Sequence, residues 1–195
     1  MNERSIRRYL AFAALAICLM IGAITAIGCA DPVPPRFNLE VTPPHWVKDT
    51  DTETELGSAG FSRVAAGGLK IQQISAETSA RLKLSDRVYA IALDAAGEIF
   101  TKESDQKLAQ ETALTAVSLA DSNFYRAAIA WSPAQDYFVL YRVSHEALHE
   151  ALETAFGWSI GESRRDQNGA ADDYDKLRVN KAIDRAIGAA KEDGN

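Results

Sequence analysis

The stretch YFVLYRV, from Tyr137 to Val143, decides the fold class, because five of its seven residues are aromatic or β-branched. The preceding stretch from Phe124 to Trp131 is also rich in apolar residues. Between the two, Ser132 to Asp136 contains Pro133 and other residues that favour turns. Two strand-forming stretches separated by a short turn predict an antiparallel hairpin.

Helical patterns precede the hairpin. From Leu69 to Phe100, apolar residues recur at steps of three and four, which predicts one long amphipathic helix or two helices broken near Gly97. The recurring residues are Ile71, Ile74, Thr78, Leu82, Tyr89, Leu93 and Phe100. A second helix, capped by Ser104, is expected to run to about Ala120, and its inward residues are expected to be Leu108, Leu114 and Val117.

Further helices follow the hairpin. Ser144 is expected to cap a helix from about His145 to Phe156, which has Leu148, Leu152 and Phe156 on one face. The polar stretch from Glu162 to Asp173 predicts a loop. A final helix is expected from Tyr174 to about Ala190, and its apolar residues are Leu177, Val179, Ile183 and Ile187.

Before all these elements, a short strand and turn are expected from Leu56 onward, where glycines surround Phe61 and Val64. These glycines are Gly57, Gly60, Gly67 and Gly68. The whole pattern predicts an α+β fold, in which long amphipathic helices cover a small antiparallel sheet made of a short strand and the hairpin. The domain would span residues 56–160, and residues 161–195 would add the polar loop and the last helix.

Residues 1–28 have the layout of a bacterial export signal. Arg4, Arg7 and Arg8 precede a run from Tyr9 to Gly28 that contains no charged residue. A helix of about 20 apolar residues spans a bilayer, so an uncleaved anchor is the alternative. The run ends on AIGC, at residues 26–29, which resembles the bacterial lipobox, although Leu is usual in the place of Ala26.

Cys29 is accordingly predicted to carry acyl chains after cleavage just before it. The other cysteine, Cys18, lies inside the uncharged run, so the mature chain can form no internal disulfide. At least two acyl chains are needed for stable anchoring, and a triacylated Cys29 would supply them. The remaining 167 residues would have a net charge of −8, from 18 basic and 26 acidic residues. Such an acidic body is not expected to bind nucleic acid.

Residues 29–55 predict an extended tether. This segment contains five prolines and the alternating acidic stretch DTDTETE from Asp49 to Glu55, both of which favour a stiff, solvated chain. Within it, Trp46 is expected to pack on the domain and to fix the end of the tether.

The sequence HEALH at residues 145–149 matches H-E-x-x-H, in which two histidines one helical turn apart bind zinc and the glutamate activates a water. On this interpretation His145 and His149 would be zinc ligands and Glu146 the catalytic base. A catalytic zinc also needs a third protein ligand, for which Glu162 or a later acidic residue is a candidate. The preferred interpretation is an exposed polar helix face without a metal or other cofactor.

The order of elements resembles that of the LPP20 family of bacterial lipoproteins over roughly residues 43–156. The resemblance rests on the lipobox, the Pro44-x-Trp46 segment, the paired Gly57 and Gly60, an Ala-rich helix containing Ala76, Ala80 and Arg81, and the hairpin from Trp131 to Val143. The Gly-x-x-Gly spacing and the C-terminal extension depart from the family. The resemblance implies a surface or outer-membrane lipoprotein without catalytic residues, in a family of which some members are associated with flagella.

These observations favour a non-enzymatic cell-envelope lipoprotein, anchored in the outer membrane through Cys29, that serves as an assembly or interaction module. Ala30 after the cysteine is consistent with export to the outer membrane in such proteins. Envelope proteins are the expected partners, at the strand edge of residues 56–61 or on the last helix. The alternative is a membrane-tethered zinc metallopeptidase that uses the HEALH motif.

Overall fold

The computed structural model describes residues 43–64, 67–101, 105–165 and 173–193, which fall within one compact unit, Glu40–Asn195. The predicted signal, Cys29 and the tether up to residue 42 lie outside the described residues, as does Ser104. In chain order the elements are η1 (His45–Val47), β1 (Glu55–Ser62), α2 (Gly68–Ile99), α3 (Gln106–Asp121), β2 (Tyr125–Trp131), β3 (Tyr137–Ser144), α4 (His145–Arg165) and α5 (Asp173–Asp193).

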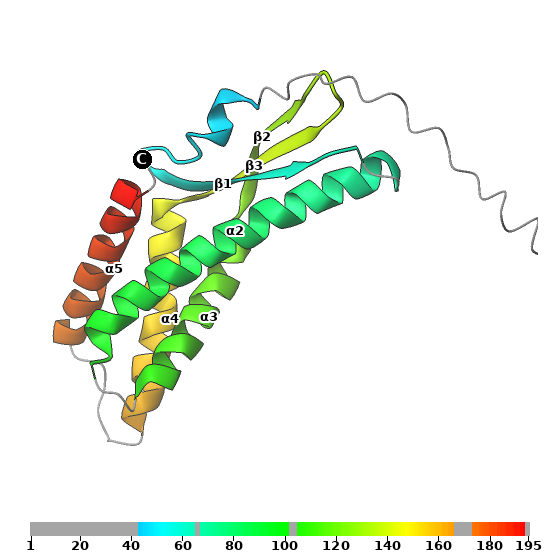
Figure 1. Ribbon diagram of the computed structural model, residues 1–195. Coiled ribbons are helices and arrows are strands. Elements are labelled where there is room, and N and C mark those ends of the chain that lie inside the picture. The colour runs from blue at the N-terminus through cyan, green and yellow to red at the C-terminus, as the bar shows by residue number, and fades with distance from the viewer. Residues whose placement is uncertain (1–42, 65–66, 102–104, 166–172, 194–195) are drawn as a thin grey trace, which may run out of the picture. The chain divides into compact units, whose positions relative to one another are not determined.

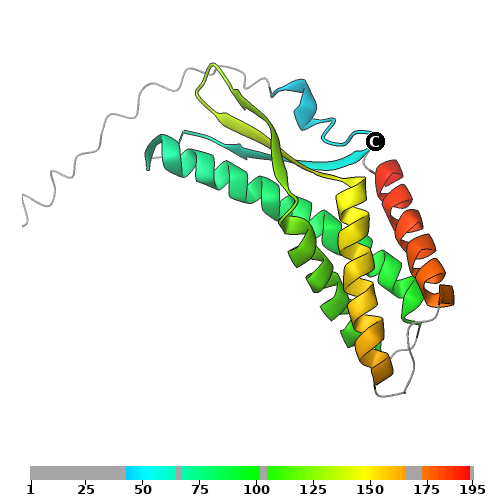
Figure 2. The ribbon, with the colours of Figure 1, turned by 180° about the vertical axis from the view of Figure 1, so that it is seen from behind.

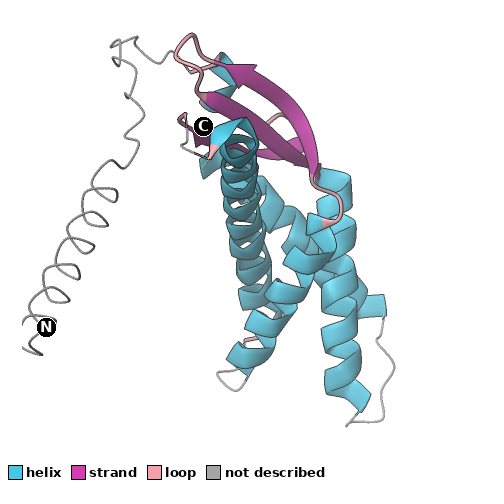
Figure 3. Cartoon of the chain, turned by 90° about the vertical axis from the view of Figure 1, so that its right-hand side faces the viewer, coloured by secondary structure: helices cyan, strands magenta, loops and turns pink. Residues whose placement is uncertain are grey.

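The sheet has three antiparallel strands in the order β1-β3-β2, so the hairpin strand β3 is central (Figure 1). Helix α2 crosses one face of the sheet, and α3, α4 and α5 extend away from the sheet beside the second half of α2 (Figures 1 and 2). In the side view of Figure 3, the strands lie together on one side of the helices. The predicted α+β class and the predicted hairpin are confirmed.

The helix α4 begins where the sequence predicts. The Oγ atom of Ser144 accepts a hydrogen bond from the backbone N–H of Ala147 at 3.1 Å, which is the expected N-cap. Leu148, Leu152 and Phe156 are all buried, as predicted. The helix continues past Gly157 to Arg165, so the expected loop from Glu162 begins too early.

The inward faces of α2 and α3 differ from the prediction, whereas α5 buries Val179, Ile183 and Ile187 of its four expected apolar residues. Leu82 of α2, Leu114 of α3 and Leu177 of α5 are 60%, 61% and 69% exposed, and Ile71 and Ile74 are also exposed. The face of α2 that packs inward consists mainly of Ala76, Ala80, Leu84, Val88, Ile91, Ala92, Ala95 and Ala96. Small residues let backbones approach closely, so the core follows the alanines rather than the largest side chains. Helix α2 is continuous through Gly97, so the single long helix is the correct one of the two predicted alternatives.

Two glycines of β1 fix what lies on each face of this strand. A Cβ atom on Gly60 would lie 1.9 Å from the backbone oxygen of Ala76, because α2 packs directly on that face. A Cβ atom on Gly57 would lie 2.1 Å from the backbone oxygen of Thr50. Residues three apart on a strand point to opposite faces, so Gly60 admits the helix and Gly57 admits the segment before β1.

The folded part begins earlier than the predicted boundary at residue 56. Arg87 of α2 donates two hydrogen bonds of 2.7 Å to the two carboxylate oxygens of Asp51, and Asp51 also accepts the backbone N–H of Gly57 at 2.8 Å. Arg142 donates to the backbone oxygen of Thr50 at 3.0 Å. Thr50 and Asp51, which the sequence analysis assigns to a solvated tether, therefore pack on the sheet.

This arrangement controls the charge of Asp51. Burial alone would raise the pKa of its carboxyl group, but the hydrogen bonds from Arg87 and Gly57 and the charge of Arg87 outweigh burial and lower the pKa. The carboxylate is therefore more acidic in the folded than in the unfolded chain. Its stabilising contribution is present above the unfolded-state pKa of about 4 and is lost as the pH falls through the lower folded-state pKa.

We expect Asp51→Asn to lower the free energy of unfolding at neutral pH by about 2 kcal/mol, because the charge-assisted hydrogen bonds to Arg87 weaken. The difference from the unmodified chain should shrink as the pH falls from about 4 through the lower folded-state pKa, where Asp51 of the folded chain also becomes protonated. Urea unfolding at several pH values measures both effects, and the exposed Asp49→Asn is the matched control. A difference in unfolding free energy that stays constant with pH would mean that the charge of Asp51 does not stabilise the fold through Arg87.

Candidate functional site

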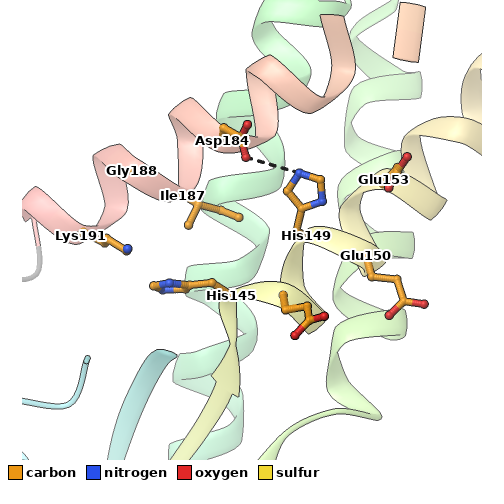
Figure 4. A pocket seen from close by; sticks show the side chains of 9 residues that line it. His145, His149, Glu150, Glu153, Asp184, Ile187, Gly188 and Lys191 are labelled. Carbon is orange, nitrogen blue, oxygen red and sulfur yellow. Dashed lines mark ion pairs between the residues drawn. The ribbon is translucent and has the colours of Figure 1, made fainter. Parts of the chain in front are cut away.

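The HEALH motif lies at the start of α4 and faces α5, where it lines a pocket of about 600 Å³ (Figure 4). The lining residues are His145, Glu146, His149, Glu150 and Glu153 of α4, and Asp184, Ile187, Gly188 and Lys191 of α5. Four carboxylates, two imidazoles and one ammonium group make the pocket acidic on balance. Its residues offer no hydroxyl or thiol nucleophile.

One histidine of the motif has an acidic partner. The Nε2 atom of His149 lies 3.4 Å from the Oδ1 atom of Asp184, which joins α4 to α5. Asp184 itself is exposed, so solvent screens this pair and its contribution to stability is small. The contact orients the imidazole ring away from the other histidine of the motif (Figure 4).

The other histidine lies where the chain leaves the sheet. The backbone N–H of His145 donates to the backbone oxygen of Thr54 at 2.8 Å, beside β1. Burial lowers the pKa of the imidazole, and the nearby positive charge of Lys191 lowers it further. A hydrogen bond that the imidazole donates to the backbone of Glu53 and the carboxylates of Asp51 and Glu55 oppose this shift only in part, so the pKa of His145 stays below its usual value.

The two histidines do not converge on one point. The ring of His149 is turned toward Asp184, whereas the ring of His145 lies on the Lys191 side of Ile187 (Figure 4). Within the described part of the chain, no three histidine, cysteine, aspartate or glutamate side chains form a group able to hold a metal ion. Glu146 is exposed, and the side chain of Glu162 is outside the described part. Among the described side chains, no third protein ligand lies with His145 and His149, as a catalytic zinc would require.

The acidic pocket lies at the joint between α4 and α5. Lys191 contributes to this joint, because its Nζ atom donates to the backbone oxygen of Glu53 at 2.8 Å. At the other end of α5, Arg178 donates to the backbone oxygen of Glu98 at 2.7 Å, at the C-terminus of α2. These contacts hold the last helix against the rest of the domain.

The α5 side of the pocket is not among the residues predicted from the sequence. Asp184 and Gly188, like Ile187 and Lys191, are four residues apart, so each pair shares a helix face that is visible in the sequence. Nothing in that spacing shows that the face meets α4. Cys29, the predicted lipid-attachment site, lies outside the described residues.

Comparison with known proteins gives no family for the chain: no family model matches it, and no curated protein matches it. The resemblance to the LPP20 family stays a prediction from the sequence. None of the described helices is both long enough and apolar enough to cross a membrane.

Proposed function

We propose that this protein is a non-enzymatic cell-envelope lipoprotein, anchored in the outer membrane by acyl chains on Cys29, whose domain serves as an assembly or interaction module. The observation that carries this proposal is the N-terminal sequence. Three arginines precede a run without charge, and that run ends on Ala26, Ile27, Gly28 and Cys29. The basic, apolar and small-residue regions occur in the order that export and lipid attachment require.

The domain is compatible with this role. Both cysteines of the chain precede residue 43, so the described domain folds around a core of alanines and larger apolar side chains without a disulfide. The thiol of Cys29 has no other cysteine in the mature chain with which to pair. In the described part, the conspicuous polar pocket joins α4 to α5 and lacks a nucleophile and a triad of metal ligands.

The anchor is tested by the mass of the N-terminal peptide isolated from membranes. We expect a peptide that begins at Cys29 and carries the added mass of acyl chains. The variant Cys29→Ser should lack that mass and should leave the membrane fraction or retain its uncleaved signal, because serine provides no thiol for lipid attachment. An unmodified chain that retains Met1 would refute the proposal.

The zinc-peptidase alternative makes a different prediction. If His145 and His149 bound zinc, the purified chain would contain one zinc per molecule, and His149→Ala would remove it. The geometry instead predicts less than about one tenth of an equivalent of zinc after exchange into metal-free buffer, because a structural or catalytic site needs three or four protein ligands. Elemental analysis of the unmodified chain and of the His149→Ala variant decides between a zinc peptidase and a protein without bound zinc. Stoichiometric zinc that His149→Ala abolishes would favour the peptidase.

A further inference from the structure

The turn between β1 and α2 lies at the end of α2 that is away from α5 (Figure 1). Ser62, the last residue of β1, and Trp131, the last residue of β2, both pair with Tyr137, so the two strands end at the same level of the sheet. Gln72 of α2 donates to the backbone oxygen of Ser62 at 3.1 Å and to that of Gln135, in the hairpin turn, at 2.7 Å. The β1–α2 turn and the hairpin turn therefore form one end of the domain.

Large apolar side chains are exposed at this end. They belong to the ends of two strands, to the β1–α2 turn and to the first turns of α2, and each is between 40% and 61% exposed. An exposed apolar cluster of this kind marks an interaction site. The cluster, which we call the turn patch, consists of Phe61, Val64, Leu69, Ile71 and Trp131.

The surroundings of the turn patch are basic, although the chain as a whole has a net charge of −6. Residues 56–76 contain two charged residues, Arg63 and Lys70, which are both exposed, and no acidic residue. In the hairpin, residues 122–135 also contain no acidic residue. Asp136 is buried and accepts a hydrogen bond from the Oγ atom of Ser132 at 3.2 Å. Exposed apolar side chains and cations therefore occur together here, in segments that lack exposed carboxylates.

This combination fits the surface of an anionic lipid bilayer. Apolar and aromatic side chains enter the boundary between headgroups and acyl chains, and each Lys or Arg near an anionic surface strengthens binding about fivefold. Acidic groups elsewhere on the domain oppose this attraction only weakly, because salt at physiological concentration screens charges beyond about 8 Å. A second copy fits less well, since a two-fold symmetric contact would bring Arg63 and Lys70 of one copy against the same residues of the other.

We propose that the turn patch, together with Arg63 and Lys70, docks the domain onto an anionic lipid bilayer. The apolar side chains of the turn enter the interface, and the two cations bind lipid phosphates. If Cys29 is lipidated, which rests on the proposed function, residues 30–42 have a reach of at most about 45 Å, which lets the domain touch the membrane that holds the anchor. Docking would orient the domain with α5 away from the bilayer (Figure 1).

Fluorescence of the full chain in lipid vesicles tests this docking. Cys18 and Cys29 are replaced by serine, and an environment-sensitive fluorophore is attached at Val64→Cys or, as the control, at Leu177→Cys on α5. The uncharged run of residues 9–28 is long enough to hold this unprocessed chain in a bilayer, so the readout does not require acyl chains. In vesicles of phosphatidylcholine and phosphatidylglycerol, we expect emission from position 64 to shift to shorter wavelength, and emission from position 177 to remain that of a label in water.

A pair of charge variants tests the contribution of the two cations. Arg63→Gln combined with Lys70→Gln should lower the ratio of docked to free domain by up to about thirtyfold, because each cation contributes about fivefold. Lys176→Gln combined with Lys181→Gln removes the same charge from exposed positions on α5 and should leave this ratio unchanged.

A pair of leucine variants tests the apolar contribution. With the fluorophore at position 64, Leu69→Asp should abolish the shift, because a carboxylate would enter the headgroup boundary beside anionic lipids. Leu177→Asp introduces the same charge at a position of similar exposure on α5 and should retain the shift. Lipid attachment is tested separately, by the mass of the N-terminal peptide.

Three outcomes overturn the proposal. The first is equal emission from positions 64 and 177 in anionic vesicles, which would leave the turn patch to a protein partner. The second is an equally large shift in vesicles of phosphatidylcholine alone, because attraction to anionic lipid would then play no part. The third is a shift that grows with the ratio of protein to lipid, which would make a second copy the occupant.

Discussion

Gly60→Ala should destabilise the fold by about 3 kcal/mol or more, although it adds a single methyl group. The new Cβ atom would lie 1.9 Å from the backbone oxygen of Ala76 and 2.8 Å from the backbone nitrogen of Ala80. Both atoms belong to the backbone of α2, so no side-chain rotation relieves the overlap. Helix α2 would have to move off β1, and the contact between the helix and the sheet is a major part of the core.

Thermal or urea unfolding followed by circular dichroism measures this effect. For a chain of this size we expect the midpoint of thermal unfolding to fall by about 10 °C. The control is Gly157→Ala in α4, where an added Cβ meets nothing within 4 Å and alanine favours the helix by about 0.5–1 kcal/mol. If Gly60→Ala were as stable as the unmodified chain, α2 could not lie as close to β1 as described.

Leu84→Ala and Leu82→Ala should differ sharply, although the two leucines are two residues apart on α2. Leu84 is completely buried, so truncating it leaves a cavity and should cost about 2–5 kcal/mol. Leu82 is 60% exposed, so its truncation should change the free energy of unfolding by less than about 0.5 kcal/mol. The two variants have the same change in helix propensity, which therefore cancels in the comparison.

Urea unfolding of both variants gives the two free energies. The comparison also tests which face of α2 is inward, because the spacing of the larger apolar residues in the sequence favours Leu82 and the structure favours Leu84. A larger loss for Leu82→Ala would mean that the helix is rotated relative to the described arrangement.

The pocket at the HEALH motif illustrates why a short motif does not define a site. The sequence places His145 and His149 one helical turn apart, and the structure keeps them on the same side of α4. Each histidine nevertheless has its own surroundings, because Asp184 lies beside one and Lys191 beside the other. Those neighbours come from α5, about 40 residues later in the chain.

The sequence by itself determined the elements whose signals are local. The hairpin follows from β-forming residues on both sides of a turn, and the cap at Ser144 and the buried face of α4 follow from residues within two or three turns of each other. These features depend on backbone preferences and on side-chain periodicity, which a short window of sequence contains.

Only the tertiary structure decided which helix faces are inward, what the two glycines of β1 accommodate, and where the folded part begins. Helix α2 has alanines at positions 76 and 80, where Gly60 of β1 lies directly against the helix backbone, and it buries Leu84 one turn further on. Asp51 is bound by Arg87, which is 36 residues further along the chain. Such choices depend on the fit between surfaces distant in sequence, and a local pattern contains no information about the partner surface.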